Sequence, residues 1–232
     1  VMQAGAVIVP MDAREVRIGR LLTDVTAGFR TEGSAITPTD PTFDTVNLVA
    51  NTMSALTVGS LEWFHDVDNA DQLVSESIAK AIALRLDLAA LYGGIIAGAG
   101  TINLPTPPNP RGVLAALNAL AASNVLGAAT NGTPQTSTSF WRELIQTLFQ
   151  VRAFNDEPTG IIWNSKAAQQ YADAYDTTGQ PLLVPDAIKA IPSYISNQIP
   201  SYTQGTMTSR ATDVFAGDWS QLLIGQRLED RG

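Results

Sequence analysis

The stretch NADQLVSESIAKAIALRLDLAALYGG, from Asn69 to Gly94, is the feature that most limits how this chain can fold. Glu76, Lys80 and Asp87 fall on one side of a helix drawn through it. The other side is apolar at the spacing of helical turns, through Leu73, Val74, Ile78, Ala81, Leu84, Leu88, Leu91 and Tyr92. At about 1.5 Å per residue such a helix is roughly 35 Å long, enough to span a domain. We therefore predict one amphipathic helix here and call it the spine helix.

Both ends of the spine helix have sequence signals. Asn69 is a favourable N-cap residue, and Gln72, three residues later, has the spacing of a capping box. At the other end Gly93 or Gly94 can adopt the left-handed conformation that closes a helix. Arg85 interrupts the apolar side, and we expect its side chain to reach solvent or a carboxylate rather than a ligand.

Composition excludes several classes of protein. The chain has 232 residues, of which 45% are hydrophobic, so it can bury a sizeable core. Its formal net charge is -8 and it has no basic run, which argues against tight binding to nucleic acid or to an anionic membrane. No apolar run reaches the ~18–20 residues of a membrane span. The chain begins at Val1 without the charged start of a signal peptide, and we expect it to be part of something longer.

Residues for catalysis or for metal and cofactor binding are scarce. There is no cysteine, and the only histidine is His65, for which we expect a structural role. The glycines in Gly98–Gly100 are a poor dinucleotide signal, because prolines follow where a helix should start. Asp156 and Glu157 could serve as an acid and a base, but two adjacent carboxylates before Pro158 are more simply a solvated turn. We therefore predict no catalytic, cofactor-binding or metal-binding residues.

A long hairpin is predicted before the spine helix. Leu21–Arg30 and Thr45–Gly59 favour extended structure, and the stretch between them, Thr31–Asp44, is rich in Thr, Pro, Asp and Gly. Two extended arms around a polar tip indicate a projecting hairpin. A hairpin of this length is marginal alone, so we expect it to lie on a partner.

The rest of the chain mixes helices and strands. We predict a helical turn at Ser60–Asp66 and a turn at Asp176–Gly179, with short edge strands and loops in Leu182–Ile199. We predict helices at Arg111–Ala122, Ser139–Ala153 and Lys166–Tyr175, the last of them capped by Asn164 or Ser165. We predict strands at Gly160–Trp163, Asp213–Ala216 and Leu222–Arg227. No repeat is visible, and the order of elements indicates an α+β fold.

Several of these segments together resemble a known family. DVFAGDWSQLLIGQR, Asp213–Arg227, is similar to a family pattern of a short strand, Gly-Asp, an aromatic residue, Ser and an apolar strand. Three more matches occur in family order: Phe29–Leu48, then Leu86-Asp87 and Leu91–Gly93 followed by Pro110 and Gly112–Leu114, then Ile161–Leu183. The chain thereby resembles the major capsid proteins of tailed bacteriophages, of the Hong Kong 97 type.

The resemblance implies a layout in three parts. Residues 1–26, 61–111 and 206–232 would form a peripheral domain that contains the spine helix. Residues 27–60 would form an extended loop that reaches over a neighbouring subunit. Residues 112–205 would form an axial domain around five-fold and six-fold axes. The family's amino-terminal arm and its last strands are expected to lie outside this sequence.

The resemblance also implies a function. The chain would be a structural capsid protein, not an enzyme, that assembles as pentamers and hexamers into an icosahedral shell around double-stranded DNA without binding it specifically. Scaffold or protease and portal proteins, with decoration proteins as an optional addition, would be its partners, with assembly in the host bacterial cytoplasm and a final location in the virion. The alternatives are an encapsulin-type or gene-transfer-particle shell, a small enzyme, and a host-binding or tail component.

Some family members cross-link neighbouring subunits through a lysine on the extended loop. This chain has three lysines, Lys80, Lys166 and Lys189, and none lies in 27–60. Arg30 is no substitute, because a guanidinium stays protonated and is a poor nucleophile. We therefore expect a non-covalent shell.

Overall fold

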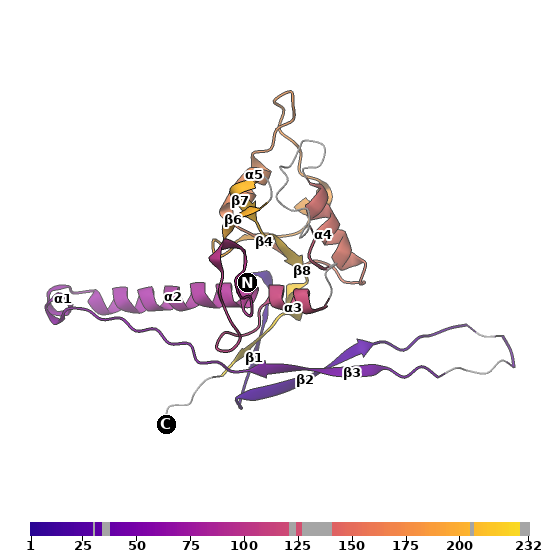
Figure 1. Ribbon diagram of the computed structural model, residues 1–232, viewed down its shortest axis with the longest axis horizontal. Helices are drawn as coiled ribbons and strands as arrows, with labels where there is room; N and C mark the ends of the chain where they lie inside the picture. Colours follow the sequence, from indigo (N-terminus) through magenta and orange to yellow (C-terminus); the bar gives the residue numbers. More distant parts are fainter. Residues whose placement is uncertain (30, 34–37, 121–123, 127–140, 205–206, 228–232) are drawn as a thin grey trace. The chain divides into compact units, whose positions relative to one another are not determined.

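The computed structural model describes residues 1–29, 31–33, 38–120, 124–126, 141–204 and 207–227, without the side chains at 61, 64, 65 and 207–210 (Figure 1). The chain divides into two compact units. The larger consists of Val1–Val7 and Asn51–Ile224, and the smaller of Ile8–Ala50 and Gly225–Gly232. His65 therefore lies outside the described side chains, and its predicted structural role stays a prediction.

Helices and short strands share the larger unit. Its helices are α1 (Leu61–Asp66), α2 (Ala70–Tyr92), α3 (Val113–Leu120), α4 (Arg142–Arg152), α5 (Ser165–Ala172) and α6 (Asp186–Lys189), with 3₁₀ turns η1 (Met2–Ala4), η2 (Ala99–Thr101) and η4 (Trp219–Gln221). Its strands are β4 (Gly160–Trp163), β5 (Ser193–Ile195), β6 (Ser201–Gln204), β7 (Met207–Thr212) and β8 (Phe215–Gly217).

The strands form small sheets. In one, β4 lies between β5, which is parallel to it, and β8, which is antiparallel. The strands β6 and β7 pair as an antiparallel hairpin. Near the ends of the chain, β1 (Val7–Pro10) pairs with β9 (Leu223–Gln226). The mixture of separate helices and small sheets confirms the predicted α+β class.

The spine helix is confirmed as α2, a helix of 23 residues. Asn69 occupies the N-cap position as predicted, but its side chain makes no capping hydrogen bond, and Gln72 donates to Glu76 at 3.0 Å instead of completing a capping box. The other end closes as predicted, since Gly94 has a φ of +86°. Arg85 is exposed, which confirms that its side chain reaches solvent, and its hydrogen-bond partner is the amide oxygen of Asn109 at 3.0 Å rather than a carboxylate.

Two glycines let the end of α2 touch the start of α3. The Gly112 amide donates to the Gly93 carbonyl at 2.8 Å. A Cβ on Gly93 would lie 2.0 Å from the Pro110 carbonyl oxygen, and one on Gly112 would lie 2.5 Å from the Gly93 nitrogen and 2.7 Å from the Ala89 oxygen. All of these neighbours are backbone atoms, so this contact requires glycine at both positions.

Two hydrophobic clusters form the core of the larger unit. The first gathers around the end of α2 and contains Ala4, Leu91, Tyr92, Ile102, Leu104, Ile162, Ile199, Phe215 and Trp219. The second lies between α4, α5 and the sheet, and contains Leu144, Leu148, Ile161, Trp163, Ala167, Ile188 and Ile191. The two adjacent isoleucines of β4 point to opposite faces of the strand and so belong to different clusters.

Burial along α2 is uneven, which corrects the expected core. Leu91 is fully buried and Leu88 packs against the first cluster, as the pattern predicts. Leu84 and Leu73, on the same side of the helix, are 51% and 46% exposed. Val74 and Ile78 on the apolar side are half-buried, so this side is continuous in sequence but is fully buried by its own chain only towards the C-terminal end of the helix.

Other predicted elements are confirmed, some with shifted ends, and the structure also has elements that were not predicted. Asn164 caps α5 by accepting from the Ala167 amide at 2.8 Å, but this helix ends at Ala172 rather than Tyr175. The predicted turn after it is confirmed, with Asp176 accepting hydrogen bonds from Thr178 and Gln180. Within Leu182–Ile199, predicted as strands and loops, the structure has the short helix α6 as well as β5. The hairpin of β6 and β7 was not predicted.

The contact between α2 and α3 gives a stability prediction. Gly112→Ala should lower the free energy of unfolding by ~1–3 kcal/mol, because the new methyl group must displace backbone. Gly217→Ala is the matched control, since a Cβ there would meet no atom within 4 Å. Urea unfolding of both variants checks this, and equal midpoints would contradict the close approach.

Candidate assembly surfaces

The predicted long hairpin is confirmed in the smaller unit. Strand β2 (Glu15–Thr23) pairs antiparallel with β3 (Thr42–Val49), with Glu15 opposite Val49 and Arg20 opposite Asp44 (Figure 1). Pairing begins at Glu15 and β2 ends at Thr23, so only Leu21–Thr23 of the described part of the predicted first arm is strand. The second strand begins at Thr42, inside the stretch predicted as the polar tip. The second arm is a strand only as far as Val49, because Asn51–Gly59 has no assigned secondary structure.

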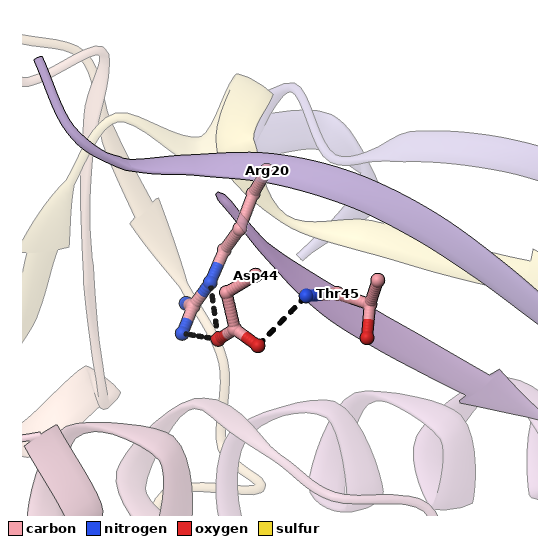
Figure 2. A network of polar contacts seen from close by, with 3 residues as sticks. All are labelled: Arg20, Asp44 and Thr45. Carbon is pink, nitrogen blue, oxygen red and sulfur yellow. Dashed lines mark hydrogen bonds and ion pairs between the residues drawn. The ribbon is translucent and has the colours of Figure 1, made fainter. Parts of the chain in front are cut away.

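Polar side chains tie the two strands together. The Arg20 guanidinium donates to Asp44 Oδ2 from Nη2 at 2.6 Å and from Nε at 3.1 Å, and the Thr45 amide donates to Asp44 Oδ1 at 2.7 Å (Figure 2). The hydroxyl groups of Thr23 and Thr42 also form a cross-strand hydrogen bond. The bonds from Arg20, with the Thr45 amide, hold the pKa of Asp44 below its usual value.

Large apolar side chains of the hairpin are open to solvent. Leu21 and Phe43 lie directly opposite one another across the strands and are 51% and 75% exposed. Leu22, Val25 and Phe29, which follow Leu21 in the sequence, are exposed too. A two-stranded hairpin is marginal in water by itself, and exposed apolar clusters of this kind mark sites of protein contact.

A second uncovered surface lies on α2. Its N-terminal part exposes Leu73, Ala81 and Leu84 on the same side of the helix that is buried further on at Leu91. We call these three residues the α2 stripe. Because the stripe continues a buried one, its exposure in a single chain indicates that another molecule covers it.

The segment with the most specific family resemblance has structural reasons for its residue types. Phe215 and Trp219 are buried in the first cluster, and the Trp219 indole donates to the Gly160 carbonyl at 2.9 Å. Asp218 caps η4 by accepting from the Ser220 amide at 3.0 Å. The motif Asp213–Arg227 therefore closes the core rather than forming a ligand site.

Asp213 joins three parts of the chain. Both of its carboxylate oxygens accept hydrogen bonds from phenols, Oδ2 from Tyr92 at 2.7 Å and Oδ1 from Tyr202 at 2.6 Å. Burial, with the charge of Asp213, raises the pKa of both tyrosines far above the usual value, so they stay neutral donors. No local pattern predicts this group, because 121 residues separate Tyr92 from Asp213.

The phenol of Tyr171, which is half-buried, is also structural. Tyr171 stacks between Trp141 and Trp163, with ring centroids 4.9 Å and 5.5 Å away. Burial, with the nearby charge of Glu143, raises the pKa of Tyr171 to about 12. At neutral pH it therefore remains protonated and does not act as a base.

The two carboxylates considered above as an acid and a base lie at the surface. Asp156 and Glu157 are both exposed, and Glu157 accepts from Arg152 at 3.0 Å. Gly98 and Gly100 belong to the connector around η2, where the Gly98 amide donates to the Ile102 carbonyl at 2.9 Å. Among the described residues, no group of three or more His, Asp and Glu side chains is placed to hold a metal ion.

None of the described helices has the length and apolarity to cross a membrane.

Comparison with known proteins identifies a family model and solved structures that this chain resembles. The family model described as the phage capsid family matches residues 1–229. A structure from Mycobacterium phage Cain has a TM-score of 0.74 at 17% identity, over 98% of this chain and 70% of that chain. The capsid of an empty GTA particle, computed with C5 symmetry, has a TM-score of 0.67 at 18% identity, over 97% of this chain and 75% of that one.

Another structure, from Microbacterium phage Oxtober96, has a TM-score of 0.62 at 18% identity, over 97% of this chain and 72% of that one. The comparison with curated proteins gave no match. At these identities the likeness establishes the fold, which is of the Hong Kong 97 type.

The pair of Arg20 and Asp44 gives a prediction about pH. Because the pKa of Asp44 is lowered in the folded hairpin, the pair supports the hairpin above the ordinary carboxyl pKa, and this support is lost as the pH falls through the folded value. Arg20→Gln should raise the Asp44 midpoint in a carboxyl-carbon NMR titration. Arg17→Gln is the control, since Arg17 pairs with Glu15; equal midpoints in the two variants would refute the assignment.

Proposed function

Because the chain belongs to the phage capsid family, it is a structural protein of a capsid shell rather than an enzyme, and we propose that its copies assemble as pentamers and hexamers around double-stranded DNA. The family makes it a homo-oligomer whose place is the virion capsid. We propose further that the pentamers and hexamers form an icosahedral shell and that this shell encloses double-stranded DNA.

The observation that supports the proposal most is the hairpin of β2 and β3. This hairpin has only two strands, and its own chain leaves the side chains of Leu21 and Phe43 exposed to solvent. The α2 stripe is a second apolar surface left open in the single chain. A protein that assembles with copies of itself buries several of its faces in subunit contacts, and exposed apolar surfaces such as the hairpin and the α2 stripe are suited to such contacts.

A division into three parts is proposed on the same basis. Residues 1–26, 61–111 and 206–232 form the peripheral domain, 27–60 the extended loop, and 112–205 the axial domain. The contact between Gly93 and Gly112 falls where the second peripheral segment meets the axial one, which fits a fixed junction there. The whole of β2, Glu15–Thr23, lies in residues 1–26 and β3 lies in 27–60, so in this division the hairpin pairs a strand of the peripheral domain with a strand of the extended loop.

The contents and partners of the shell follow from charge and from the family. A net charge of -8 fits a container that encloses DNA without binding it specifically, because the protein has no excess of cations for the phosphate backbone. Scaffold or protease and portal proteins, with decoration proteins as an optional addition, would complete a particle assembled in the host cytoplasm. Release of DNA from particles with added inner-face lysines tests the role of charge: unchanged release would contradict it.

A shell with other contents is the second candidate. The similarity to the capsid of a GTA particle supports a gene-transfer particle with the same subunit fold, and an encapsulin-type compartment would also use it. Neighbouring genes discriminate, since terminase and portal genes indicate a phage and a cargo enzyme indicates a compartment.

Self-assembly is the first test of the proposal. The full-length protein should form rings of five or six subunits or closed shells, because burial of exposed apolar surface favours association. Sedimentation velocity and negative-stain imaging over a range of ionic strengths check this. Monomer under all conditions would contradict the proposal.

The second test concerns covalent links. None of the three lysines, Lys80, Lys166 and Lys189, lies in the extended loop, so mature particles should give a monomer band in denaturing electrophoresis. A ladder of covalent oligomers would show that the shell has a cross-linking reaction that does not use a lysine of 27–60.

A further inference from the structure

The apolar side of the β2–β3 hairpin changes face along its length. Near the base, Val16, Ile18, Val46 and Leu48 are half-buried, while the residues between them are exposed. They pair across the strands as Val16 with Leu48 and Ile18 with Val46. Alternation places all four on one face, which we call the base face.

The base face is the one that holds the hairpin to its own chain. Gly225 lies against it, because a Cβ there would be 2.5 Å from Met11 Sδ and 3.5 Å from Leu48 Cδ1. Met11 is buried, and its amide donates to the Gln226 carbonyl at 2.9 Å. The start and end of the smaller unit thus pack on Leu48 within that unit.

Further out, the base face becomes polar. Arg20 and Asp44 continue it by alternation and bond one another (Figure 2). Thr42, two residues before Asp44, lies on the same face and bonds Thr23. These side chains make hydrogen bonds within the hairpin. The outer part of the base face therefore has no apolar surface that needs to be covered.

The opposite face shows the reverse pattern. Arg17, Asn47 and Thr45 occupy it towards the base, with Val49 at its lower end, and Leu21 and Phe43 form an exposed apolar pair further out. We call Leu21 and Phe43 the outer pair. It lies on the side of the hairpin away from Met11 and Gly225, so those residues do not cover it.

We propose that the hairpin uses its two faces for two molecules: the base face packs on its own chain, and the outer pair on the opposite face docks on a second copy. This rests on the proposed self-assembly and adds to it which face of the hairpin makes the contact. A second copy is the occupant because the family assembles by self-association and because each copy has uncovered apolar surface of its own, including the α2 stripe.

Single cysteines at adjacent positions test the assignment of faces. The chain has no cysteine, so Phe43→Cys and Thr42→Cys each introduce one thiol, on opposite faces of one strand. Both positions are exposed in the free subunit and should react equally with a maleimide there. In assembled particles, Phe43→Cys should lose most of its labelling and Thr42→Cys should keep it.

A charge introduced at the same two positions gives an independent readout. Phe43→Glu should abolish fast-sedimenting particles while leaving the unfolding midpoint of the free subunit unchanged, and Thr42→Glu should still assemble. Equal protection of both thiols, or normal assembly of Phe43→Glu, would overturn the assignment of faces alone. Failure of the unsubstituted protein to form particles would overturn self-assembly, and the inference with it.

Discussion

The larger unit depends on one junction, where α2 ends. Leu91 and Tyr92 are buried there, Gly93 brings its backbone against Gly112, and the Tyr92 hydroxyl reaches Asp213 from the other end of the sequence. Helix, connector and C-terminal strands meet within a few residues. Since a close-packed interior tolerates little extra volume, the small residues are as important here as the large ones.

Periodicity made the helices predictable, and the lack of a local signal explains what was missed. The spacing of Leu84, Leu88 and Leu91 identified α2, but it gives no information on which part of a helix its own chain covers. Asn69 has the right residue type for a cap, yet its side chain makes no capping bond, because N-cap preference is statistical and local geometry decides. The short helix α6 lies among prolines, which favoured strands and loops in the sequence.

The assembly surfaces were only partly predictable. A long hairpin follows from two extended arms around a polar tip, but its register does not, and register decides that Leu21 lies opposite Phe43 and Arg20 opposite Asp44. Asp213 and its two phenols come together only through the folding of distant segments. The family resemblance supplied the fold, since an order of weak motifs is informative where no single motif is.

The α2 stripe has a consequence for the subunit before it meets a partner. On the same helix, exposed Asp71 and Glu76 are offset by exposed Lys80 and Arg85, so it is the net charge of the whole chain, -8, that makes two free subunits repel one another at long range, whereas their apolar surfaces attract only on contact. Salt limits that repulsion to about 8 Å at physiological ionic strength. The apolar surface that favours the shell is thus kept from indiscriminate aggregation by charge, and the ionic strength of the medium sets how often subunits come close enough to associate.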